Sequence, residues 1–171
     1  MNIKNVVVGN LETNCYILEK DTECLIIDPG DEFNKIRDNI DKKVIGILLT
    51  HRHFDHIGAL DELTECYGVN VYDKSNLKEG LNGIGAFEFN VVYNPGHTED
   101  SISFIFNDIM FSGDFIFNGT IGRWDLGGNI LDMKNSIINI LKSNINYKIY
   151  PGHGDITFLD DEIEMLNYYL K

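Results

Sequence analysis

Positive charge is scarce in this chain. Its 14 lysine and arginine residues stand against 27 aspartate and glutamate residues, so the formal net charge is -13 at pH 7. Nucleic-acid backbones are bound through clustered Lys and Arg, which argues against such a partner. Long hydrophobic runs are also missing: no stretch approaches the roughly 20 apolar residues of a membrane span, and the valines at 6–8 are too few for a signal peptide. We expect neither a nucleic acid nor a membrane as partner.

Cysteine and proline are also few. The three cysteines, Cys15, Cys24 and Cys66, are odd in number and lack Cys-x-x-Cys spacing, which favours reduced thiols in the cytoplasm over a disulfide framework. We expect all three to be small, buried apolar side chains. With three prolines and no low-complexity segment, no linker divides the chain. We therefore predict one domain over residues 1–171, without a separate C-terminal substrate domain.

Hydrophobic patterning predicts an α/β protein with mixed sheets. β-rich apolar runs predict strands at 3–8, 15–18, 24–27, 45–49, 69–72, 87–93, 102–106, 109–111 and 148–150. Helical spacing predicts helices through residues 33–40, 57–67, 130–141 and 163–170, the last capped by Asp160 and Asp161. The uneven alternation of strands and helices favours mixed over strictly parallel sheets.

Histidine is the most informative residue that is present. Three of the five histidines, His51, His53 and His56, lie within six residues together with Asp55. Imidazole is the commonest neutral ligand for divalent ions such as zinc, so this density indicates a metal site. The other two, His97 and His153, each follow a Pro-Gly pair.

Each candidate ligand group comes shortly after a predicted strand. His51 follows the strand at 45–49, His97 the strand at 87–93, Asp114 the strand at 109–111 and His153 the strand at 148–150. If these strands lie side by side, their ends bring the ligands to one edge of the scaffold, where loops usually carry function.

Seven groups are too many for one catalytic zinc ion, which takes three protein ligands and keeps one position open. Two ions about 3.5–4 Å apart would use them all, with Asp114 as the bridge and a shared hydroxide as nucleophile. The first ion would take His51, His53 and His97, and the second would take Asp55, His56 and His153. Zinc is the expected ion, and iron and manganese suit the same ligands.

The order and spacing of these residues resemble those of a known protein family. The stretch His51–His56 resembles the His-x-His-x-Asp-His signature of the metallo-β-lactamase superfamily, and the likeness runs nearly end to end. Residues 14–17, 27–30, 95–98, 112–114 and 152–154 resemble its other motifs in order and spacing. The resemblance implies a four-layer αβ/βα sandwich with a dinuclear site at its edge, and the same division of ligands.

Within the superfamily, the chain most resembles short glyoxalase II, the hydroxyacylglutathione hydrolases. Residues 121–129 are similar to a Gly-Arg-x-Asp-x-x-Gly-Gly stretch of such proteins, although Trp124 stands where a small residue is common and Gly127 where proline is expected. True β-lactamases are disfavoured, because their best-known class resembles this chain less: it has cysteine at the position matching Asp114. Arg123 is a candidate for binding a substrate carboxylate, with a surface ion pair as the alternative. Trp124 is a candidate for the substrate pocket wall, with packing under a loop as the alternative.

The resemblance implies a metal-dependent hydrolase that cleaves thioesters of the S-lactoylglutathione kind. Asp55 has a second candidate role, either steering the hydroxide or passing a proton to the leaving group. Asp28 and Thr50 are candidates for orienting the ligating imidazoles. The alternatives are a single-iron persulfide dioxygenase, a hydrolase of another ester or thioester, and a metal-dependent interaction protein without turnover. The sequence leaves the oligomeric state open.

Overall fold

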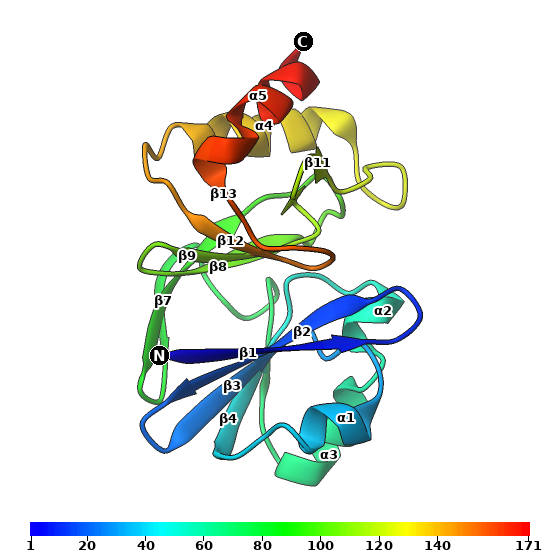
Figure 1. Ribbon diagram of the computed structural model, residues 1–171, viewed down its shortest axis with the longest axis vertical. Helices are drawn as coiled ribbons and strands as arrows, with labels where there is room; N and C mark the ends of the chain where they lie inside the picture. The colour runs from blue at the N-terminus through cyan, green and yellow to red at the C-terminus, as the bar shows by residue number, and fades with distance from the viewer.

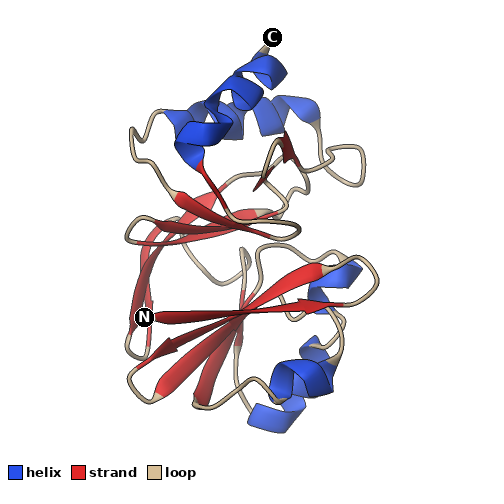
Figure 2. Cartoon of the chain, viewed as in Figure 1, coloured by secondary structure: helices blue, strands red, loops and turns tan.

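Two β-sheets pack face to face, and helices cover the outer face of each (Figures 1 and 2). The computed structural model describes residues 1–171. The chain completes one sheet and its helices before it begins the other, so the two halves follow each other in sequence. No helix is long and apolar enough to cross a membrane.

The N-terminal sheet has the order β1-β2-β3-β4-β5. Its strands are β1 (Asn2–Val8), β2 (Thr13–Lys20), β3 (Glu23–Ile27), β4 (Lys43–Leu48) and β5 (Val71–Tyr72). The first three pair antiparallel as a meander, and β4 and β5 add in parallel. The outer helices are α1 (Phe33–Arg37), α2 (Phe54–Ile57) and α3 (Leu60–Tyr67).

The C-terminal sheet has the order β13-β12-β9-β8-β7-β6. Its strands are β6 (Gly80–Ile84), β7 (Phe87–Tyr93), β8 (Ile102–Phe106), β9 (Ile109–Gly113), β12 (Lys148–Pro151) and β13 (Thr157–Phe158). A separate hairpin joins β10 (Ile116–Phe117) to β11 (Thr120–Ile121). The two long helices, α4 (Ile130–Leu141) and α5 (Leu159–Leu170), lie over the outer face of this sheet (Figure 1).

Three apolar cores separate four layers. The central core joins the facing sheets, for example through Tyr16 and Phe111, whose ring centroids lie 5.1 Å apart. A second core packs the N-terminal sheet against α1 and α3, and a third packs the C-terminal sheet against α4 and α5. The sandwich implied by the family resemblance is therefore confirmed.

Several local expectations were wrong. The helix expected through residues 57–67 is broken, because the N–H groups of Gly58 and Ala59 donate to the carbonyls of Gly30 and Pro29 instead of continuing α2. The strand at 80–84 was missed because glycines at both its start and its interior hide its pattern.

Two side-chain expectations also fail. Asp160 and Asp161 lie in the first turn of α5 and do not cap it, since the N-cap residue is Phe158. Carboxylates there still interact favourably with the positive end of the helix dipole. Cys15 and Cys24 are buried as expected, whereas Cys66 is exposed on the solvent face of α3.

Candidate metal centre

The structure brings all seven predicted ligands to one edge of the sandwich, between its two sheets. Four of them stand just beyond strand ends: His51 after β4, His97 after β7, Asp114 after β9 and His153 after β12. The short helix α2 carries Asp55 and His56, and His53 is its N-cap residue. Strands of both sheets therefore contribute to one cluster.

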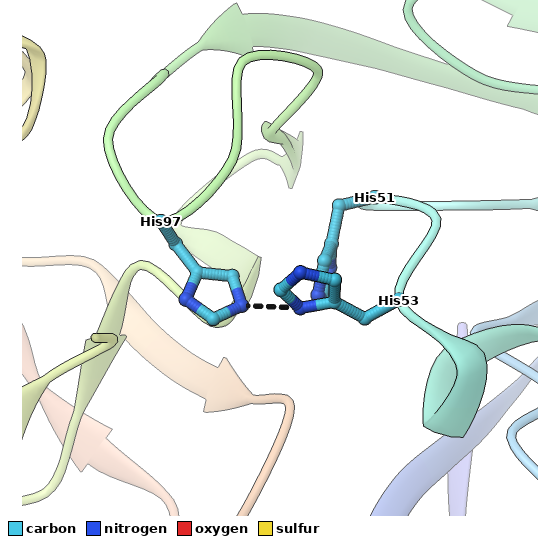
Figure 3. A group of neighbouring side chains, drawn as sticks. All are labelled: His51, His53 and His97. Carbon is cyan, nitrogen blue, oxygen red and sulfur yellow. Dashed lines mark hydrogen bonds between the residues drawn. The ribbon is translucent and has the colours of Figure 1, made fainter. Parts of the chain in front are cut away.

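The donor atoms form three overlapping groups, each with all its atoms within 4.8 Å. The groups are His51/His53/His97, His51/His56/Asp114 and Asp55/His56/His153. Figure 3 shows the first, in which His53 Nδ1 and His97 Nε2 face each other at 2.8 Å. Two of these groups match the two ligand sets expected from the sequence, and the third places Asp114 between them.

Asp28 and Thr50 orient two of the buried imidazoles. The Asp28 carboxylate accepts hydrogen bonds from the Thr50 backbone N–H (2.8 Å), the Thr50 hydroxyl (2.6 Å) and His56 Nδ1 (3.0 Å). Since the hydroxyl proton of Thr50 goes to Asp28, its oxygen accepts from His51 Nδ1 at 3.1 Å. Both imidazoles consequently turn Nε2 toward the cluster.

Backbone carbonyls orient the other three imidazoles. In each case one ring nitrogen donates to a carbonyl on a nearby loop and the other faces the cluster. The pairs are His53 with Leu126, His97 with Arg123 and His153 with Leu11. Such partners fix the tautomer of a ligating histidine.

Three inward-facing atoms are buried without a hydrogen-bond partner: His51 Nε2, His56 Nε2 and Asp114 Oδ1. His56 Nε2 and Asp114 Oδ1 lie 3.3 Å apart without hydrogen-bond geometry. An unpaired buried polar atom costs about 1–3 kcal/mol, so three at one point call for a partner that they share. A divalent cation fits, because all three atoms can donate an electron pair once His56 Nε2 has lost its proton.

Asp114 reaches toward both ligand sets. Its carboxylate oxygens lie 3.3 Å from His56 Nε2, 3.4 Å from His97 Nε2 and 3.6 Å from His153 Nε2. Burial raises the pKa of Asp114, but the His153 and His56 imidazoles beside it outweigh burial and hold that pKa well below its usual range. The side chain is therefore an anion at the centre of the cluster.

The imidazoles divide by charge when no metal is bound. Burial, together with the nearby His56, holds the pKa of His51 well below its usual value, so His51 is neutral. Burial lowers the pKa of His56 and of His153, but the carboxylates beside them raise these values to about 10 and about 9. Burial likewise raises the pKa of Asp55, but a hydrogen bond from His153 brings it down to about 2.

Two glycines allow the loops to approach the ligands closely. A Cβ on Gly122 would lie 1.8 Å from the Asp114 carbonyl oxygen, and a Cβ on Gly30 would lie 1.9 Å from the Asp55 carbonyl oxygen. Both contacts are with backbone, which cannot move without displacing a ligand. The sequence showed these glycines, but only the fold shows which ligand each one contacts.

The two candidate substrate residues have different surroundings. Arg123 lines the cleft at the cluster, and its guanidinium donates two hydrogen bonds to Asp125, at 2.9 and 2.7 Å. Trp124 lies outside the cleft lining and packs edge-on against Tyr169 of α5. The surface ion pair and the packing role are thus the alternatives that the contacts favour. Sequence reasoning missed the carbonyls of Leu11 and Leu126, since backbone acceptors have no side-chain signature.

An edge cluster of histidine and aspartate donors on a four-layer sandwich defines a class of metal-binding proteins. The family model described as Metallo-beta-lactamase superfamily matches residues 8–72 and 67–153. This chain belongs to the metallo-beta-lactamase superfamily.

Two relatives match almost over their full lengths. The Probable metallo-hydrolase YqgX of Bacillus subtilis is 35% identical, with 98% of each chain covered. The Hydroxyacylglutathione hydrolase GloC of Haemophilus influenzae is 31% identical, with 95% of each covered. The chain is therefore similar to metallohydrolases throughout.

Solved structures agree on the fold. The BLEG-1 B3 metallo-beta-lactamase has a TM-score of 0.88 at 29% identity, covering 99% of this chain and 100% of that one. ETHE1 from Myxococcus xanthus has a TM-score of 0.88 at 25% identity, covering 99% and 85%. TTHA1623 in a di-iron-bound form has a TM-score of 0.84 at 30% identity, covering 94% and 96%.

Proposed function

We propose that the protein is a two-metal hydrolase of thioesters, the class of reaction for which S-lactoylglutathione is the reference substrate. The observation that carries the proposal is the set of unpaired inward atoms, His51 Nε2, His56 Nε2 and Asp114 Oδ1, at the meeting point of two complete ligand sets. The similarity to GloC over nearly the whole chain supports the thioester class.

Two divalent ions would be held as the sequence suggested. One would take His51, His53 and His97, the other Asp55, His56 and His153, and Asp114 would contact both. Zinc is the proposed ion, and the di-iron form of TTHA1623 makes iron the first alternative to test. When bound, such ions supply a nucleophilic hydroxide at neutral pH and polarise the carbonyl.

The chain's own residues prepare this chemistry. Asp28 and Thr50 keep the inward nitrogens of His56 and His51 free of protons once the ions are in place. Asp55 lines the cleft, and its pKa of about 2 makes it a carboxylate at neutral pH. Of its two candidate roles, the charged state favours steering the hydroxide over donating a proton to the leaving group.

The bond changes are those of simple hydrolysis. Water adds to the thioester carbonyl carbon, the carbon–sulfur bond breaks, and the products are a carboxylic acid and a thiol. No redox partner is required. We further propose that the partner is a small molecule in a reducing compartment such as the cytoplasm, which suits the three free cysteines.

The proposal is tested by metal reconstitution and a substrate panel. Zinc-loaded and iron-loaded protein should hydrolyse S-lactoylglutathione or other small thioesters, and a His51→Ala variant should not, because His51 belongs to two of the three donor groups. A β-lactam belongs in the same panel because of the similarity to BLEG-1. If no thioester is cleaved faster than by the variant, the thioesterase proposal fails.

The single-iron dioxygenase remains the alternative to exclude. It needs only one ligand set, whereas Asp55, His56 and His153 form a second set with all donor atoms close together. Metal analysis and oxygen uptake on glutathione persulfide separate the two. One iron per chain with oxygen uptake would favour the dioxygenase.

Metal binding should release protons. Before binding, His56 and His153 are protonated at pH 7, with pKa values of about 10 and about 9, and only neutral imidazole coordinates. Filling both ligand sets should therefore release about two protons per chain, and affinity should rise as pH is raised toward 10. Calorimetric titration in buffers of different ionisation enthalpy measures this release, and His153→Gln should reduce it by about one. Release of no protons would contradict the charge assignment.

A further inference from the structure

The cleft at the metal-ligand residues is lined by several apolar side chains, although the protein as a whole is acidic. The cleft has a volume of about 670 Å³ and is lined by Leu11, Phe54, Phe117, Ile121 and Leu126 beside the ligands. Three of these side chains are exposed: Phe54 by 75%, Leu11 by 54% and Leu126 by 52%. Large exposed apolar side chains that gather around a reactive centre indicate a contact surface for a ligand.

The backbone holds these residues at the mouth. The carbonyl of Leu126 accepts from His53, and the carbonyl of Leu11 accepts from His153. Phe54 stands between His53 and Asp55 at the start of α2. The backbone at these three positions cannot move away without disturbing a metal-ligand candidate. We call Leu11, Phe54 and Leu126 the apolar rim.

The charges at the cleft disfavour an anionic carrier. Arg123 is the only lysine or arginine that lines it, and Asp125 occupies its guanidinium with two hydrogen bonds. The other ionisable lining groups are three of the ligand histidines and two carboxylates, Asp55 and Asp114. Glutathione carries two carboxylates. Apart from the bound metals, this cleft offers no unpaired lysine or arginine to bind them.

We propose that the apolar rim selects thioesters whose substituent next to the scissile bond is a hydrocarbon or aromatic group, in preference to glutathione thioesters. This inference rests on the proposed thioesterase function and names the substrate class within it. Each methylene buried against the rim should raise kcat/KM about fourfold, in line with the free energy of burying a CH₂ group.

The test uses the metal-loaded full chain and two series of thioesters. One varies the acyl group from acetyl through butanoyl to hexanoyl and phenylacetyl on the neutral thiol N-acetylcysteamine. The other keeps the acetyl group and lengthens an alkyl thiol. The series in which kcat/KM rises identifies which end of the substrate meets the rim. If both series are flat, or if S-lactoylglutathione exceeds every member of both, the proposal is overturned.

Rim variants make the test specific. Phe54→Ala and Leu126→Ala should reduce the gain per methylene, whereas Leu131→Ala, which removes a 71% exposed leucine from α4, should not. Asp125→Asn should release Arg123 and raise the turnover of S-lactoylglutathione relative to that of the acetyl thioester. Metal content and thermal unfolding of each variant show whether its site is intact.

A binding measurement separates failure of this inference from failure of the proposed function. Calorimetry with acetate, hexanoate and phenylacetate on the zinc-loaded protein needs no turnover. If hexanoate and phenylacetate bind more tightly than acetate, and Phe54→Ala removes this difference, the apolar rim binds hydrocarbon groups. That result would support the inference even if no thioester is hydrolysed. Equal affinity for all three acids, together with no gain along the alkyl-thiol series, would overturn it, even if thioesters are hydrolysed well.

Discussion

Replacing Asp114 with asparagine should lower kcat/KM of the metal-loaded protein by about 10³-fold or more. Asp114 is the one carboxylate within 3.6 Å of imidazoles from both ligand sets, at 3.4 Å from His97 and 3.6 Å from His153. A metal ion contributes several kcal/mol to a hydrolytic transition state, and each 1.36 kcal/mol is a factor of ten in rate. Asparagine keeps the shape of the side chain and removes the charge between the two ions.

Metal stoichiometry and steady-state kinetics measured together test this prediction. We expect the bound metal to fall from about two ions per chain toward about one, because neutral amides bind divalent cations less tightly than carboxylates. Asp108→Asn is the matched control, since it makes the same change at an exposed position just before β9. Retention of both ions with activity within tenfold of the parent would show that Asp114 does not bridge.

Replacing Asp28 with asparagine should weaken metal binding and activity by about 10–100-fold, the usual cost of removing the partner of a ligating histidine. The carboxylate of Asp28 accepts three hydrogen bonds, two from Thr50 and one from His56. An amide has one acceptor oxygen, so its NH₂ group would face another donor. Unpaired buried donors cost about 1–3 kcal/mol, and each kcal/mol lowers Tm by about 2–4 °C in a protein of this size.

The Asp28→Asn substitution removes the side-chain charge without changing the backbone conformation. Asp28 has a left-handed φ of 49°, and asparagine tolerates this conformation well. Asp21 has a similar φ of 51° in an exposed turn, so Asp21→Asn controls for the backbone effect. Chelator competition gives the metal affinity and calorimetry gives Tm. If Asp28→Asn binds metal as tightly as Asp21→Asn does, Asp28 does not orient His56.

Much of the site could be read from the order of residues, because metal ligands have few chemical alternatives. His51, His53 and His56 are close in sequence, and Pro-Gly pairs mark His97 and His153. The groups after these strand ends do meet at one edge, but not because the four strands lie side by side, since β4 belongs to the other sheet. The helix break at Gly58 was not predictable. It depends on hydrogen bonds to Gly30 and Pro29, which form a turn far from Gly58 in the sequence.

The surroundings of the site could not be read in the same way. Arg123 and Trp124 are neighbours in sequence, yet one lines the cleft while the other packs under α5. Asp125, two residues after Arg123, was the available signal for an ion pair, but pairing depends on the turn that the loop makes. Exposed apolar residues such as Leu11 have no pattern that assigns them to a ligand site.

The sequence by itself determined the reactive groups of this protein: five imidazoles and two aspartates whose chemistry suits divalent metal. It also determined the alternation of buried strands and amphipathic helices, because burial imposes its period on the residues. The tertiary structure decided which nitrogen of each imidazole faces inward, through Asp28, Thr50 and the carbonyls at Leu11, Arg123 and Leu126. It also decided what surrounds the cluster, because contacts between distant loops depend on how the two sheets pack and not on local residue order.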